Sequence, residues 1–302
     1  MWDMLRWAGL PFGLLAVSYS VSLVAPTYAQ SPLMPKGCLR PSGFIELKNP
    51  SDPKVIVQRV DFDGPIHLPD SVVMDAVAYE NSLEPDTNVP FWLDQFAELG
   101  LKAAWQDRGY YRAKVTAEAH SLGSDSKEER FLVTAHVDEG LQYHLGDLKF
   151  VNTKPSDATP FSDSQLRDSF SLQEGQLLNV ALVRKGMEEL NQRYISQGYI
   201  DFTATPEIQT DDYLQRISIV MRLDPQKQFR VRTLEVIGLD PILEGRLRAT
   251  IRPGSVYDPT AVDAFLKQNH QIRPPDKSLN VSRNQSAGTV DLIFDFRPCP
   301  PM

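Results

Sequence analysis

The feature that most constrains the fold is a run of apolar residues ending at a glycine, which occurs twice with a separation of 89 residues. In each copy the apolar positions recur at every fourth residue, a spacing that indicates a helix with one buried face. The first copy is Leu93, Ala97, Leu101 and Trp105, and the second is Leu182, Gly186, Leu190 and Tyr194. A chain that repeats this pattern is predicted to repeat a folded unit.

A glycine and a tyrosine follow each helix, as Gly109 and Tyr110 in the first copy and Gly198 and Tyr199 in the second. Glycine adopts the left-handed conformation that ends a helix, because it has no Cβ to clash. An alternating, strand-like run comes next in both copies. We therefore interpret each Gly-Tyr pair as a structural corner that turns a helix into a strand and is packed by the aromatic ring.

The repeat extends beyond the helix and includes a first strand that occurs three times. Its copies are RVDFDG (59–64), DLKFVN (147–152) and TLEVIG (233–238). A short helix is expected after each, at 69–81, 162–172 and 241–251. Each unit then closes with strictly alternating apolar residues, the pattern of a well-buried last strand. The predicted order in each unit is strand, helix, helix, strand, strand.

We expect three such units, at residues 55–140, 142–225 and 229–298, joined by links of a few residues. The third unit diverges, since HQIRPPDKSLNVS stands where a glycine and a tyrosine should end its second helix. That helix is expected to be short, near 258–269. The middle strand of the third unit is expected near 278–283.

The N-terminus predicts export from the cytoplasm. Arg6 precedes an apolar run at 7–24, and Thr27 and Ala29 provide small residues at the −3 and −1 positions of a cleavage site. We interpret residues 1–29 as a signal peptide and residues 30–54 as a proline-rich linker. A retained membrane anchor is the alternative, because the run approaches the roughly 20 residues needed to span a bilayer.

Two cysteines, Cys38 and Cys299, lie near the two ends of the exported chain. An oxidising compartment permits a disulfide between them, and a bridge to a second copy is the other possibility. Lipid attachment at Cys38 is disfavoured, because Pro35 and Lys36 stand where small apolar residues are needed.

Composition and motifs argue against nucleic-acid binding and against catalysis. The formal net charge is −8 and the sequence contains no dense Lys/Arg run, whereas a nucleic-acid binder shows a basic stripe. The five histidines are scattered, without an H-E-x-x-H pair or a cysteine at metal spacing. His136 is read as a solvated strand residue. We therefore expect no catalytic residue, no metal site and no cofactor.

The segments RGYYRAKV and QGYIDFTA, in a β-α-α-β-β unit that occurs in tandem, resemble the POTRA domain. The resemblance implies an α+β fold of three tandem domains, each a three-stranded mixed sheet covered by two helices. POTRA arrays form the periplasmic part of the outer-membrane insertases of the BamA/TamA type. A membrane barrel needs at least about eight strands of roughly ten residues. Only RPCPPM follows Phe296, so we expect no barrel and no insertase activity.

The resemblance also implies that the last strand of each unit is central and that the first two strands are edges. Pairing of an edge with an extended peptide is β-augmentation, in which the backbone supplies affinity and alternate side chains tune selectivity. The candidate edges are 111–120 and 200–208. Their candidate peptide-binding residues are Arg112, Lys114, Thr116, Glu118, Phe202 and Ala204. The competing interpretation is that charged residues guard these edges against unwanted pairing.

The sequence thus predicts a periplasmic, non-enzymatic protein-interaction module. Its expected partners are outer-membrane polypeptides or an outer-membrane assembly or translocation complex. Contact with a membrane is expected only through an associated barrel protein or an uncleaved N-terminus. The alternative is a membrane-anchored structural scaffold of the cell envelope, like the POTRA-containing division proteins.

Overall fold

Three sheets of three strands each follow one another along the chain. The computed structural model describes residues 54–82, 89–124, 128–154, 160–269 and 279–297. We call residues 54–140 module 1, residues 142–225 module 2 and residues 229–297 module 3. The two cysteines and the expected signal peptide lie outside the described residues.

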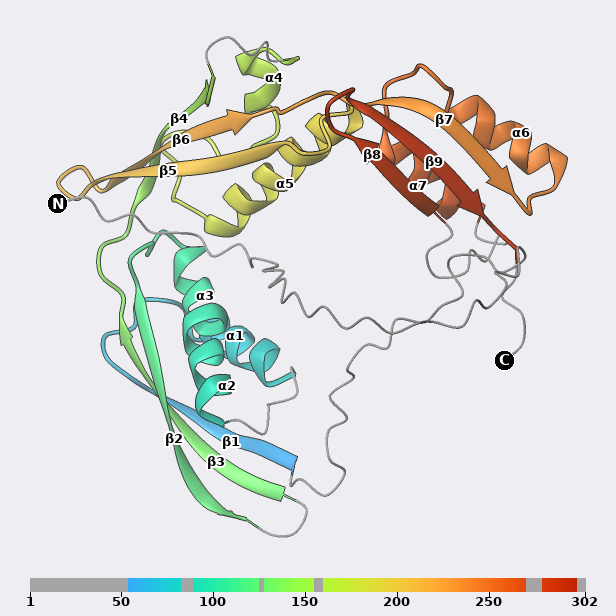
Figure 1. Cartoon of the computed structure of the whole chain (residues 1–302). Helices are drawn as coiled ribbons and strands as arrows, with labels where there is room; N and C mark the ends of the chain where they lie inside the picture. The colour runs from blue at the N-terminus through green and yellow to red at the C-terminus, as the bar shows by residue number, and fades with distance from the viewer. Residues whose placement is uncertain (1–53, 83–88, 125–127, 155–159, 270–278, 298–302) are drawn as a thin grey trace, which may run out of the picture. The chain divides into compact units, whose positions relative to one another are not determined.

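In each sheet the last strand of the module lies between the first two (Figure 1). It runs parallel to the first strand and antiparallel to the second. The orders are β1-β3-β2, β4-β6-β5 and β7-β9-β8. The strands are β1 Lys54–Asp63, β2 Lys114–Ser124, β3 Glu128–Asp138, β4 His144–Asn152, β5 Thr203–Asp211, β6 Arg216–Asp224, β7 Arg230–Ile237, β8 Leu279–Asn284 and β9 Thr289–Asp295. The predicted α+β fold with three three-stranded mixed sheets is confirmed.

Helices cover one face of each sheet, and the other face is open (Figure 1). Module 1 has α1 Asp70–Ser82, α2 Val89–Gln95, the π-helical turn η1 Phe96–Leu101 and α3 Lys102–Gln106. Module 2 has α4 Asp163–Arg167 and α5 Val180–Ser196, and module 3 has α6 Pro241–Thr250 and α7 Pro259–Gln268. Ser162 starts α4 with a complete capping box, which satisfies backbone donors that the helix itself leaves unpaired.

The helix predicted from the apolar stripe of module 1 contains a π-turn that the sequence pattern does not show. In a helix with 3.6 residues per turn, side chains spaced by exactly four residues move gradually around the helix axis. A wider π-helical turn brings them back toward one face. With η1 in place, all four stripe residues of module 1, from Leu93 to Trp105, are buried. In the uninterrupted helix α5, Leu182 at the start of the stripe is only partly buried.

Each module has its own hydrophobic core between its sheet and its helices. The central strands supply alternate side chains that are almost fully buried, such as Val133 in β3, Ile217 in β6 and Leu292 in β9. The last stripe residues, Trp105 and Tyr194, are completely buried at equivalent places in modules 1 and 2. The helix that ends at each corner is therefore held by its bulkiest side chain, one turn before the glycine.

A glycine in α5 tests how tightly module 2 is packed, and a glycine in α6 of module 3 provides the comparison. A methyl group on Gly186 would lie 2.2 Å from Cδ1 of Phe170, whereas a methyl group on Gly245 in α6 meets nothing within 4 Å. We expect Gly186→Ala to lower the free energy of unfolding by about 1–3 kcal/mol through overpacking. Gly245→Ala should raise it by about 0.5–1 kcal/mol, because alanine is the better helix former.

Amide hydrogen exchange within α5 and within α6 measures the two effects separately. Equal protection of α5 in the parent protein and in Gly186→Ala would show that Phe170 moves aside without cost. Gly245→Ala is the matched control for a change in helix propensity alone.

Candidate functional site

Each sheet leaves two edge strands, and their outward-facing N–H and C=O groups are the first candidate for a binding surface. The three first strands are interrupted edges. Their pairing with the central strand shifts between Val57 and Arg59 in β1, between Leu145 and Leu148 in β4 and between Val231 and Thr233 in β7. A bulge of this kind bends and twists an edge away from further pairing.

The edge of β5 is interrupted by a proline. Pro206 pairs with Met221 in a ladder that runs without a register shift from Thr203 to Asp211. Proline has no N–H, so an unbroken ladder accommodates it where the backbone faces away from the partner strand. The outward edge of β5 therefore lacks a donor at its middle.

The edge of β2 is the most regular one in the described part of the chain. Lys114 to Ser121 pair with β3 in a single register, and the first shift comes between Ser121 and Gly123. This run contains no proline and is longer than β8, which has six residues. Ala117 occupies the place of Pro206, since the two are separated by the same 89 residues as the corner glycines. By this equivalence the N–H of Ala117 faces outward.

Three of the predicted peptide-binding residues lie on this edge strand. Lys114, Thr116 and Glu118 are exposed on the open face of the sheet, and His120 continues the series. The alternate residues Val115, Ala117 and Ala119 face the helices and pack against the core of module 1. The β2 edge thus has a polar side and an apolar side.

The other three predicted residues lie elsewhere. Phe202 precedes β5 and is buried, with its ring stacked 3.8 Å from that of Tyr194. Ala204 packs against the core of module 2. Arg112 precedes β2, and its guanidinium pairs with Asp212 of module 2 at 2.8 Å. For Phe202 and Ala204 only the backbone faces an edge, because the phase of the alternation points both side chains inward.

The corner glycines adopt the conformation that the sequence predicts. The φ angle is +89° at Gly109 and +81° at Gly198, a region in which a Cβ clashes. Tyr110 packs against the core of module 1, and the Tyr199 ring lies edge-on to Tyr194 with centroids 5.9 Å apart. Both tyrosines therefore pack the corner within their own module.

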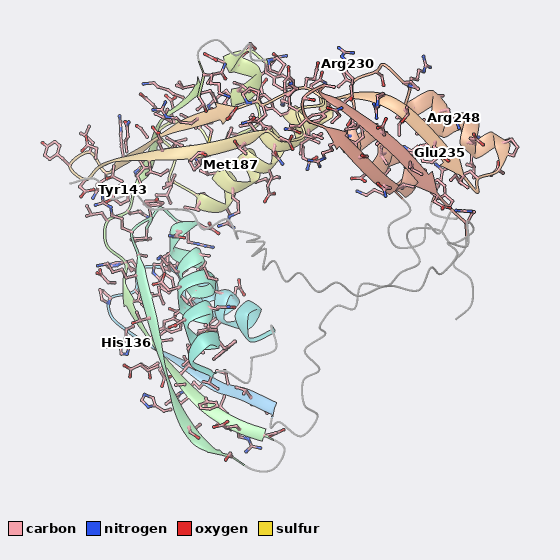
Figure 2. The ribbon with its side chains drawn as sticks, viewed as in Figure 1. His136, Tyr143, Met187, Arg230, Glu235 and Arg248 are labelled. Atoms are coloured by element: carbon pink, nitrogen blue, oxygen red, sulfur yellow. The ribbon has the colours of Figure 1, made fainter. Side chains whose placement is uncertain are left out.

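Each corner also binds the start of the next module, a role that the sequence interpretation missed. The carbonyl oxygen of Gly109 accepts a hydrogen bond from the N–H of Tyr143 at 2.8 Å, and that of Gly198 accepts one from the N–H of Phe229 at 2.8 Å. Tyr143, which Figure 2 labels, is almost fully buried, as is Phe229. The sequence feature that could have revealed this role is a glutamine followed by an aromatic residue, which occurs after each link between modules.

Those glutamines complete the contact in the same way at both corners. Gln142 Nε2 donates to the carbonyl oxygen of Arg108 at 2.9 Å, and Gln228 Nε2 donates to that of Gln197 at 2.9 Å. At the first corner, a methyl group on Gly109 would lie 2.9 Å from the backbone carbonyl oxygen of Tyr143. At the second corner, a methyl group on Gly198 would lie 2.7 Å from the backbone carbonyl oxygen of Phe229. Close approach of the two backbones therefore requires glycine at both places.

One buried carboxylate lies at the end of module 1, just before the link to module 2. Glu139 is 3% exposed and accepts hydrogen bonds from Trp105 Nε1 at 2.7 Å and from the backbone N–H of His67 at 2.8 Å. Its second oxygen lies 2.6 Å from His67 Nδ1. Burial raises the pKa of Glu139, but the hydrogen bonds from His67 and Trp105 outweigh it and hold the pKa below the ordinary 4.5.

The histidines of the described residues do not form a metal centre. His136 lies on the open face of its sheet with Nδ1 3.1 Å from Asp63 Oδ2 (Figure 2). Within the ranges given above, no three His, Cys, Asp or Glu side chains gather where they could hold a metal ion. No helix in those ranges has the length and apolarity needed to cross a membrane.

The middle of the chain is similar to a known protein family. Residues 143–226 match the family model described as "POTRA: Surface antigen variable number repeat". Over 239 residues the chain is 22% identical to a protein of Treponema pallidum (strain Nichols) named "Putative outer membrane protein assembly factor". That alignment includes 73% of this chain and 26% of the other protein, so the chain spans about a quarter of the relative's length.

A solved structure extends the likeness to all three modules. The crystal structure of BamA POTRA3-5 from Haemophilus influenzae superposes with a TM-score of 0.55. The superposition covers 80% of this chain and 95% of that one at 17% identity. At this identity the likeness is one of fold, and it matches the three-module arrangement of the strands and helices.

The inferred direction of the β2 backbone predicts unequal losses of stability for proline at two adjacent positions. The N–H of Thr116 should face β3, so Thr116→Pro should remove a ladder bond, leave its acceptor unpaired and lower the free energy of unfolding by about 1–3 kcal/mol. Ala117→Pro should cost less than about 1 kcal/mol, because its ring replaces an outward-facing N–H as Pro206 does. Urea unfolding followed by tryptophan fluorescence reports module 1, since Trp92 and Trp105 are the tryptophans of residues 30–302. Equal losses would show that the assignment of direction is wrong.

The carboxylate of Glu139 should make module 1 acid-sensitive. Its pKa is depressed in the folded state, so its contribution is fully present above 4.5 and is lost as the pH falls through the folded-state pKa. We expect Glu139→Gln to lower the free energy of unfolding by about 1.5–3 kcal/mol at pH 7. The difference between parent and variant should shrink toward pH 3. A difference that stays constant from pH 7 to pH 3 would contradict a stabilising role for the charge.

Proposed function

We propose that this chain is a tandem POTRA-domain protein and a non-enzymatic interaction module that binds outer-membrane polypeptides by strand pairing at the β2 edge. The single observation that carries this proposal is the uninterrupted run from Lys114 to Ser121. The other long edge carries Pro206, and the three first strands carry register shifts. The name of the Treponema relative supports a role in outer-membrane protein assembly.

The two sides of the β2 edge suit a particular class of peptide. Strands of outer-membrane proteins alternate apolar and polar residues with a period of two. A strand added to β2 would place one set of its side chains beside Ala117 and Ala119, next to the core, and the other set beside Lys114 and Glu118. An alternating peptide therefore buries its apolar residues and keeps its polar residues in water.

The edge supplies backbone bonds at every second residue. Eight residues in one register offer roughly four outward-facing positions. Each neutral hydrogen bond contributes about 0.5–1.5 kcal/mol net, so binding through this edge is weak and reversible. Weak binding suits a protein that holds a chain in transit. In this proposal the protein acts in the periplasm after cleavage of residues 1–29.

The experiment compares residues 30–302 with two variants at equivalent positions. Ala117→Pro removes the outward N–H of β2, and Pro206→Ala restores an outward N–H to β5. The probe is a ten-residue peptide of alternating apolar and polar residues from an outer-membrane strand, with a scrambled peptide of equal composition as control. Fluorescence anisotropy gives the affinities.

We expect Ala117→Pro to weaken binding about tenfold or more, because it removes one bond and its ring blocks the neighbouring one. Pro206→Ala should bind as tightly as the parent or more tightly. Undiminished binding to Ala117→Pro would exclude the β2 edge. If the parent protein binds neither peptide, polypeptide capture is excluded altogether, and docking of the whole array to an assembly complex becomes the better hypothesis.

A further inference from the structure

The hairpin that joins the last two strands of a module contacts the corner of the preceding module. At the first corner, Arg112 stands three residues after Gly109 and points to the β5–β6 hairpin. Its Nη1 donates to both oxygens of Asp212, at 2.8 and 3.1 Å, and its Nη2 donates to Thr210 Oγ1 at 2.6 Å. The corner is the cationic partner, and the hairpin is the anionic one.

At the second corner the charges of the corner and of the hairpin are reversed, although on the hairpin Arg283 stands at the place of Thr210 and Gln285 at the place of Asp212. Asp201 stands three residues after Gly198 and faces the β8–β9 hairpin. Its Oδ1 accepts from Arg283 Nη1 at 3.0 Å, and its Oδ2 accepts from Gln285 Nε2 at 3.0 Å. Here the corner is anionic and the hairpin is cationic.

The aromatic residue at each junction also suits the charge of the hairpin that it adjoins. The hydroxyl of Tyr143 donates to Asp212 Oδ1 at 2.8 Å, so it adds a donor for the anionic hairpin. Phe229, at the equivalent place, has no hydroxyl and adjoins the cationic hairpin of module 3. The backbone bonds and the glutamine bonds are the same at both junctions. Charge is therefore one feature that distinguishes two docking surfaces with the same backbone and glutamine bonds; another is the hydrogen bond from the N–H of Ala181 to Asp107 Oδ1 at the first junction.

We propose that this reversed polarity is a pairing code, by which each corner accepts the hairpin of its own following module and repels the other hairpin. The wrong pairings would set Arg112 against Arg283, or Asp201 against Asp212. Neighbouring modules of similar fold are prone to misassembly while they fold. Specificity between such similar surfaces requires a repulsive element as well as an attractive one. The inference does not depend on peptide binding at β2.

The first experiment uses residues 30–302 and tests whether the Arg112–Asp212 ion pair holds the first junction closed. Asp212→Arg places like charges at the first corner and should open it. The amide of Tyr143, bonded to Gly109, then exchanges about tenfold faster, while the amide of Phe229, bonded to Gly198, reports the untouched junction. Adding Arg112→Asp should restore the exchange rate of Tyr143 to within about twofold of the parent. If Asp212→Arg leaves that rate unchanged, or if Arg112→Asp fails to restore it, the proposal is overturned.

The second experiment tests the code itself. The double variant Arg112→Asp with Asp212→Arg has two junctions of the same polarity, so the wrong hairpin is no longer repelled. We expect its yield of monomer after refolding to fall at least about twofold as protein concentration rises. Adding Asp201→Arg and Arg283→Asp makes the polarities differ again and should recover the parent yield. Equal yields from the double and the fourfold variants at every concentration would show that the charges carry no pairing information.

Discussion

The positive φ of the corner glycines is the constraint on which the rest of the array depends. It turns the chain out of a helix that Trp105 or Tyr194 anchors in the core. It also presents a carbonyl oxygen that binds the first aromatic residue of the next module. One residue therefore ends a helix, starts an edge strand and receives the following module. No other residue type combines this conformation with so close an approach of two backbones.

Much of the architecture was predictable because it rests on local periodicity. The central strands show strict alternation and are nearly fully buried, and the corner glycines have the conformation that their place after a helix requires. The π-turn at Phe96–Leu101 was not predictable, because a stripe with a period of four reads as an ordinary helix. The inward orientation of Phe202 and Ala204 was not predictable for a related reason. The alternation of this segment does not reveal which set of side chains faces the core.

The contacts that distinguish this array lie between residues far apart in sequence. Arg112 and Asp212 are a hundred residues apart, and each reads in isolation as an ordinary solvated charge. The buried role of Glu139 was equally hidden, because its donors come from a loop at His67 and from the helix at Trp105. Sequence patterns identify a residue by its neighbours along the chain, so they identify elements well and partners poorly.

The bulged first strands and the proline of β5 also have a consequence for the protein in concentrated solution. Sheets that expose long, regular edges can join edge to edge into extended polymers. Here the register shifts in β1, β4 and β7 and the proline at position 206 interrupt four of the six edge strands in the described residues. Those interruptions leave two of the described edges, the long run in β2 and the six-residue β8, at which another strand can still pair.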